Sequence, residues 1–224
     1  MRLLYGLIAL IICTAFCFKG EPVSILFSPK FGNQNVVPGK NYFLPAVNDS
    51  VSVETFRFYV SDICFMKNKK IVFRDKDAHL IDLESQLNIL YKNKISDFDE
   101  VQFSIGIDSI TNSGGVKGGD LDPTKNMYWA WQSGYINFKL EGKSNLCATR
   151  KNEFQFHLGG YQFPFNALQT VSLKLKQSDT AQVTFDVRQF IWDIDLTHQN
   201  QIMSPSKEAV LLSKKVAKAF SIKQ

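Results

Sequence analysis

Alternation of apolar and polar residues with a period of two is the strongest constraint on how this chain folds. It recurs in six short segments: 51–60, 101–107, 135–140, 154–158, 171–176 and 183–187. A period of two puts every second side chain on one face, so each segment is predicted to be a half-buried strand. One slip in the alternation of the first segment predicts a β-bulge. Glycine, proline and asparagine turns separate the strands, and no strand–helix rhythm appears. The sequence predicts an all-β fold, an antiparallel β-sandwich.

Residues 206–220 show helical periodicity instead. Ala209, Leu212 and Val216 form an apolar stripe at helical spacing, and Ser206 is positioned to cap the N-terminus. Lysines gather in the last turns, where they complement the helix dipole. We expect this C-terminal helix to cover an open face of the sandwich.

The N-terminal segment predicts export. Residues 3–15 are almost entirely apolar and uncharged, a length suited to a signal peptide and short of the ~20 residues that span a bilayer. Small residues at Ala15 and Cys17 predict cleavage after Cys17. We therefore expect a signal peptide at 1–17, a single domain at 18–224 with no transmembrane segment, and a location in the periplasm or at the cell surface. A short buried helix, or a lipid anchor at Cys13 or Cys17, is a less favoured alternative.

The composition favours packing over catalysis. The chain has 19 Phe but only 3 His and 4 Cys. Its formal net charge of +5 comes from scattered basic residues and gives no reason to expect nucleic acid as a partner. The common metalloprotease, hydrolase and nucleotide-binding motifs are absent, so we expect a protein that is not an enzyme.

Two cysteines, Cys64 and Cys147, remain after removal of the signal peptide. In an exported protein two such cysteines most often pair, so a disulfide is predicted. Two buried free thiols, or a copper thiolate, are the alternatives.

Three carboxylates could provide hard oxygen ligands for calcium: Asp108, Asp120 and Asp122. Their spacing does not match an EF-hand loop. Aspartates that cap turns explain the same pattern, and the residues alone favour that interpretation.

The block 118–142, which includes Met127-Tyr-Trp-Ala-Trp131 and Gly134-Tyr-Ile-Asn-Phe138, resembles the central signature of the MbnP-like family. Flanking blocks fit the same family in the same order: 59–63, 79–83, 103–108, 156–161 and 202–205. The resemblance runs from about residue 23 to about residue 220.

The resemblance implies an exported bacterial β-sandwich protein associated with copper. In named members, histidines hold a copper ion, and a tryptophan oxidised to kynurenine takes part in the site. That oxidation is attributed to a di-haem peroxidase of the MauG type. The resemblance thus implies copper binding for acquisition, storage or transfer, with such a peroxidase as partner.

The resemblance also suggests metal ligands. His79 and His157 fall inside matching blocks, and His198 lies just before another, so all three are candidate copper ligands. Imidazole nitrogen is a usual ligand for copper. Met203 could add a soft thioether for Cu(I), but packing beside the C-terminal helix is the favoured interpretation.

Two tryptophans of the central block, Trp129 and Trp131, are the candidates for oxidation. As ordinary residues they would be aromatic anchors of a core. If they are exposed, the segment 128–131 favours a second hypothesis, a non-metal interaction module of the same sandwich fold.

Overall fold

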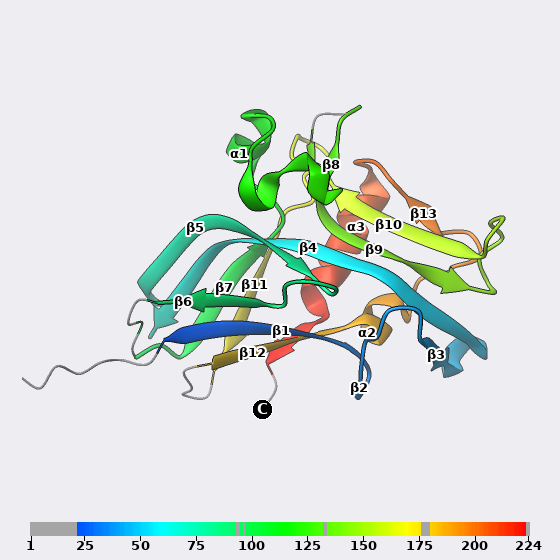
Figure 1. Cartoon of the computed structure of the whole chain (residues 1–224), viewed down its shortest axis with the longest axis horizontal. Helices are drawn as coiled ribbons and strands as arrows, with labels where there is room; N and C mark the ends of the chain where they lie inside the picture. Colours follow the sequence, from blue (N-terminus) through cyan, green and yellow to red (C-terminus); the bar gives the residue numbers. More distant parts are fainter. Residues whose placement is uncertain (1–21, 93–94, 96, 132–133, 176–179, 223–224) are drawn as a thin grey trace, which may run out of the picture.

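The computed structural model describes residues 22–92, 95, 97–131, 134–175 and 180–222, and these form two facing β-sheets (Figure 1). The predicted signal peptide, residues 1–17, lies outside the described residues. Within them, no helix is both long and apolar enough to cross a membrane.

The smaller sheet has five strands in the order β14–β12–β1–β2, with β6 also paired to β1. These strands are β1 (Val23–Phe31), β2 (Gln34–Asn35), β6 (Asn88–Tyr91), β12 (Thr180–Asp186) and β14 (Phe220–Ile222). β1 and β12 are parallel, with Ser24 opposite Thr180. This sheet therefore joins the two ends of the described chain.

The larger sheet has nine strands in the order β11–β7–β4–β9–β10–β13, with β3 and β5 on β4 and β8 on β9. They are β3 (Asn41–Leu44), β4 (Asp49–Lys67), β5 (Lys70–Asp82), β7 (Glu100–Ile105), β8 (Tyr128–Trp129), β9 (Gly134–Ser144), β10 (Glu153–Gly159), β11 (Gln169–Lys174) and β13 (Gln201–Ile202). β4 shifts register between Val53 and Thr55, which confirms the predicted bulge.

Helical elements are short except for the last. They are η1 (Pro45–Val47), α1 (Ser109–Ser113), η2 (Gly119–Leu121), η3 (Pro123–Lys125), α2 (Val187–Ile191) and α3 (Lys207–Lys218). The Ala209 N–H donates to Ser206 Oγ at 3.0 Å, as the predicted cap requires. The predicted stripe is buried, and α3 contacts both β10 and β11, which lie far apart in the strand order. The larger sheet therefore curls around the helix.

Phenylalanines fill the space between the sheets. Phe58 stands edge-on to Phe27 of the smaller sheet, with 5.5 Å between ring centroids. Phe56 and Phe138 lie 5.1 and 5.4 Å from Phe185 by the same measure. Every second residue of the central strands enters this main core, as the alternation predicts. The predicted β-sandwich with a C-terminal helix is confirmed, with the addition that β1–β12 and β10–β13 pair in parallel.

Candidate functional site

Between β7 and β9 the chain folds over the outer face of the larger sheet. This excursion, residues 106–131, holds α1, η2, η3 and β8 at the top of the view in Figure 1. Its apolar residues pack on strand residues that point away from the main core. They form a second core: Tyr59, Leu80, Ile107, Leu121, Met127, Trp129, Tyr135 and Ile136. The excursion contains the first half of the central block that carries the family resemblance.

Hydrogen bonds fix the excursion to the sheet. The Tyr59 hydroxyl donates a hydrogen bond to the Asp120 carbonyl oxygen, and the Leu80 N–H donates one to Asp120 Oδ2, both at 3.0 Å. Gly106 has a φ of +110°, and the Asn137 amide occupies the space where a Cβ would lie. A side chain at Gly106 would therefore be excluded both by strain and by collision. These contacts hold the start of the excursion and η2 against β4, β5 and β9.

The structure brings one of the predicted tryptophans close to one of the predicted histidines. Trp129 is 5% exposed, and its ring covers Gly159 on β10 so closely that a Cβ there would lie 2.8 Å from it. Alternation along β10 puts Gly159 on the same face as His157, about 7 Å further along the strand. Trp131 lies 6.0 Å from Trp129 between ring centroids and is 68% exposed. The tryptophan pair therefore runs from the surface to Gly159, two residues after His157 on β10.

His157 lies on the outer face of the sheet, because its neighbours Phe156 and Leu158 enter the main core. It is buried, and its Nε2 is 2.7 Å from Glu141 Oε1 on β9. Lys139 Nζ lies 3.5 Å from the same oxygen. The Nδ1 atom makes no hydrogen bond to any described residue. A carboxylate that holds one ring nitrogen and leaves the other free is the usual setting of a metal-binding histidine.

The register of β13 against β10, continued by one residue, puts Met203 level with His157. β13 pairs in parallel with β10, Gln155 opposite Gln201 and Phe156 opposite Ile202. Met203 is the residue that follows in register, beside His157. The two segments still run together further on, since a Cβ at Gly160 would lie 3.0 Å from the Pro205 side chain. Nitrogen and sulfur donors therefore occupy neighbouring positions.

The other two histidines lie elsewhere. His79 is on β5 and faces inward like Ile81, with its Nε2 2.7 Å from Asp75 Oδ2. The Tyr91 hydroxyl of the smaller sheet donates to the same oxygen at 3.0 Å. His198 lies between α2 and β13, with Nδ1 2.8 Å from Asp195 Oδ2 and its side chain 82% exposed.

The three predicted histidine ligands are thus not brought together. His79 and His157 lie on opposite faces of the larger sheet, and β4 and β9 separate their strands. In the described part of the chain, no group of three or more His, Cys, Asp or Glu side chains is arranged to hold a metal ion. A site that needs all three imidazoles does not fit this geometry.

The structure contradicts the predicted disulfide. Cys64 and Cys147 are both free and buried. Val51 pairs with Ser144, which places Cys147 near the start of β4. Cys64 lies thirteen residues further along β4, roughly 40 Å of extended strand, whereas a disulfide needs Cα atoms within about 7 Å. Burial raises the pKa of both thiols, that of Cys147 to about 11, so both are inert thiols rather than a bridge.

The three aspartates proposed for calcium have separate hydrogen bonds. Asp108 Oδ1 accepts the N–H groups of Ile110 and Thr111 and caps α1. Asp122 caps η3, and Asp120 binds the edge of β5 as described above. Asp108 and Asp122 thus have the turn-capping role favoured by the residues alone, whereas Asp120 links the excursion to β5.

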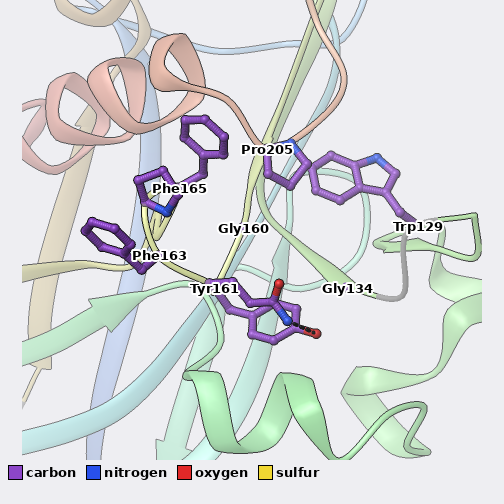
Figure 2. Close-up of a pocket in the computed structure, with 9 residues that line it drawn as sticks. Trp129, Gly134, Gly160, Tyr161, Phe163, Phe165 and Pro205 are labelled. Atoms are coloured by element: carbon purple, nitrogen blue, oxygen red, sulfur yellow. Dashed lines mark hydrogen bonds between the residues drawn. The ribbon is translucent and has the colours of Figure 1, made fainter.

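A pocket of about 310 Å³ lies beside Trp129. Figure 2 shows Phe163 and Phe165 on one side, Trp129 and Pro205 on the other, and Tyr161 below. None of the described residues that line it is charged: Trp129, Gly134, Gly160, Tyr161, Gln162, Phe163, Pro164, Phe165 and Pro205. Trp129 therefore lines this pocket and also covers Gly159 of β10.

Stability at low pH should depend on Glu141. The hydrogen bond to His157 lowers the pKa of Glu141 from 4.5 to about 2; partial burial opposes this shift and Lys139 supports it. A carboxyl group with a lowered folded-state pKa stabilises the fold above its unfolded value, and the contribution is lost as the pH falls through the folded value. We expect wild-type protein to lose at most about 3 kcal/mol from this source between pH 4.5 and pH 2.

Urea unfolding of wild type and Glu141→Gln at pH 5, 4 and 3 measures this contribution. The variant should show a flatter decline in unfolding free energy over that range. Glu84→Gln, at a 59% exposed side chain, is the matched control and should follow the wild-type curve. Identical slopes for wild type and Glu141→Gln would contradict the assignment.

The fold and the site define a class of protein: a curled β-sandwich with a tryptophan-bearing excursion packed on the outer face of its larger sheet. The sequence matches the MbnP family model over residues 20–204, and the chain belongs to the MbnP family. This is a copper-associated, methanobactin-related family that is not known for enzymatic activity.

One solved structure supports the fold. MbnP from Methylosinus trichosporium superposes with a TM-score of 0.60, over 78% of this chain and 79% of that chain, at 14% sequence identity. At that identity the likeness concerns the fold alone. No curated protein matches the sequence significantly.

Proposed function

We propose that this protein is exported and binds copper for acquisition, storage or transfer, with His157 as the central ligand. Membership of a copper-associated family supports the metal. The uncharged apolar run at 3–15 supports export to the periplasm or cell surface. The observation that carries the proposal is the pairing of His157 with Glu141 beside Trp129, which leaves Nδ1 free.

The donor chemistry at this position fits a soft cation. His157 supplies an imidazole nitrogen and Met203 a thioether, and both suit Cu(I). Glu141 orients the ring. His79 lies on the opposite face of the larger sheet and His198 on an exposed loop, so neither joins the proposed site.

Anaerobic titration of the purified protein with Cu(I), against a competing chelator, tests the proposal. We expect one copper ion per chain, bound tightly enough to compete with the chelator. Binding far below one equivalent would reject it.

We further propose that a di-haem peroxidase of the MauG type oxidises one of the two tryptophans to kynurenine. Trp131 is accessible from solvent and Trp129 adjoins His157, so the pair provides both an accessible ring and one beside the proposed ligand. The expected result is the mass change of tryptophan-to-kynurenine conversion, located by peptide mapping to residues 128–131. It should appear only when the peroxidase is co-expressed; unmodified peptide under that condition would exclude the reaction.

A second candidate function is an interaction module without metal. Trp131 is exposed, and so is Phe163, which lines the pocket beside Trp129; both favour such a module. Trp129 is buried and cannot contribute to an interaction surface. Of the two tryptophans in the segment 128–131, only Trp131 can therefore contact a partner in this way.

A further inference from the structure

The exposed side of α3 carries a row of lysines. Lys207, Lys214 and Lys218 are exposed, and Leu211, which is 51% exposed, lies among them at spacings of four, three and four residues. Such spacing keeps all four side chains on one face of a helix, over a length of about 16 Å. Lys215 flanks the row, and α3 contains one carboxylate, Glu208. This face of the helix is therefore strongly positive.

The charge of this row is not neutralised within the described part of the chain. There, the ammonium groups of Lys207, Lys214 and Lys218 form neither an ion pair nor a hydrogen bond. Lysines on other elements do pair with a carboxylate, as at Lys67, Lys125 and Lys139. The positive charge of α3 is therefore available to a partner outside the chain.

α2 lies beside the C-terminal half of α3 and extends this surface. Gln189 Nε2 donates to the Lys218 carbonyl oxygen, and Lys215 Nζ donates to the Asp193 carbonyl oxygen, both at 3.2 Å. Gln189 and Asp193 also line an open hollow of about 490 Å³, together with Asp186, Arg188 and Trp192. A fifth cation, two carboxylates and an indole that is 46% exposed thus adjoin the lysine row.

We propose that this surface, the lysine row of α3 with the adjoining hollow of α2, docks on an anionic phospholipid bilayer. It carries five cations against three carboxylates, so its charge is complementary to phosphate headgroups. The inference goes beyond copper binding and rests on the proposed export, which brings the chain to a membrane surface.

The kinds of side chain favour a bilayer over a folded acidic partner. Lysine is a point charge on a flexible stem, whereas arginine is the residue suited to fixed, two-pronged recognition of carboxylates. A row of unfixed lysines therefore suits a fluid surface of headgroups. Leu211 within the row supplies an apolar side chain, and Trp192 in the hollow supplies an amphipathic ring of the kind that enters the headgroup region.

The number of lysines determines the expected strength. One lysine near an anionic bilayer strengthens binding about fivefold at physiological salt. Loss of two lysines should therefore weaken binding about 25-fold. Because few apolar side chains are exposed on this surface, the association should be peripheral and reversible by salt.

Cosedimentation with vesicles tests the proposal on residues 18–224, which include every described element and lack the apolar run at 3–15 that could itself bind lipid. At about 0.1 M salt the wild type should sediment with vesicles that contain about 30% phosphatidylglycerol, and stay in solution with pure phosphatidylcholine. About 0.5 M salt should release it. No copper is added, and export is measured separately by the N-terminal sequence of the exported protein, so the proposals can fail independently.

Lys214→Gln/Lys218→Gln should weaken vesicle binding about 25-fold, and because glutamine has nearly the helix propensity of lysine, α3 should be retained. Lys70→Gln/Lys76→Gln is the matched control, since it removes the same charge from two exposed positions on β5, and it should leave binding unchanged. Leu211→Gln should weaken vesicle binding about fourfold without changing retention on heparin.

Three results would overturn the proposal. One is failure to sediment with anionic vesicles, and another is an equal loss of binding in the two double variants. The third is retention on heparin without vesicle binding, which would assign the surface to a soluble polyanion instead.

Discussion

Replacement of His157 by alanine is expected to lower the affinity for Cu(I) by at least about 100-fold, because it removes the central nitrogen donor of the proposed site. Glu141→Gln should have a smaller effect, about tenfold, since it weakens only the group that orients the ring. Both effects are measured by competition with a chelator of known affinity under anaerobic conditions.

His198→Ala is the matched control, because that side chain is 82% exposed and lies on a separate loop. His79→Ala tests the opposite face of the larger sheet. Neither should change the copper affinity appreciably. An unchanged affinity for His157→Ala, with circular dichroism that confirms a native fold, would contradict the proposed site; a loss with His79→Ala would move the site to the inner face.

Replacement of Gly142 by alanine is expected to destabilise the fold by about 3 kcal/mol or more. Gly142 lies on β9 between β4 and β10, and a Cβ there would lie 1.9 Å from the Ser52 carbonyl oxygen and 2.5 Å from the Phe154 ring. The backbone oxygen cannot move away without separating two paired strands. Thermal unfolding and urea titration measure the loss.

Gly118→Ala is the control for this change. Gly118 has an ordinary negative φ of −92°, and a Cβ there meets nothing within 4 Å. Its replacement should change the unfolding free energy by less than about 0.5 kcal/mol. Equal stability of the two variants would contradict the close approach of β4 and β9.

Local patterns predict the elements of this fold but not their partners. Alternation identifies the central strands, and the spacing from Ala209 to Val216 identifies α3, because burial of one face determines both periods. No local pattern in the sequence encodes the direction of β12 relative to β1. It depends on how strands distant in sequence pack, and the parallel pairs were therefore missed.

The site was predictable only in part, for the same reason. The family resemblance selected both His157 and Trp129, and the structure places the Trp129 ring over Gly159, two residues from His157 on β10. Glu141 was missed because its proximity to His157 depends on the register of β9 against β10, which no local pattern encodes. The prediction of a disulfide between Cys64 and Cys147 was wrong because the number of cysteines and an export signal carry no information about the distance between the two residues.

The pairing of β1 with β12 has a consequence for biogenesis. β2 and β6 are near enough in the sequence to pair with one edge of β1 early in synthesis. Its other edge pairs with β12, about 150 residues later, so the smaller sheet cannot close until most of the polypeptide has been made.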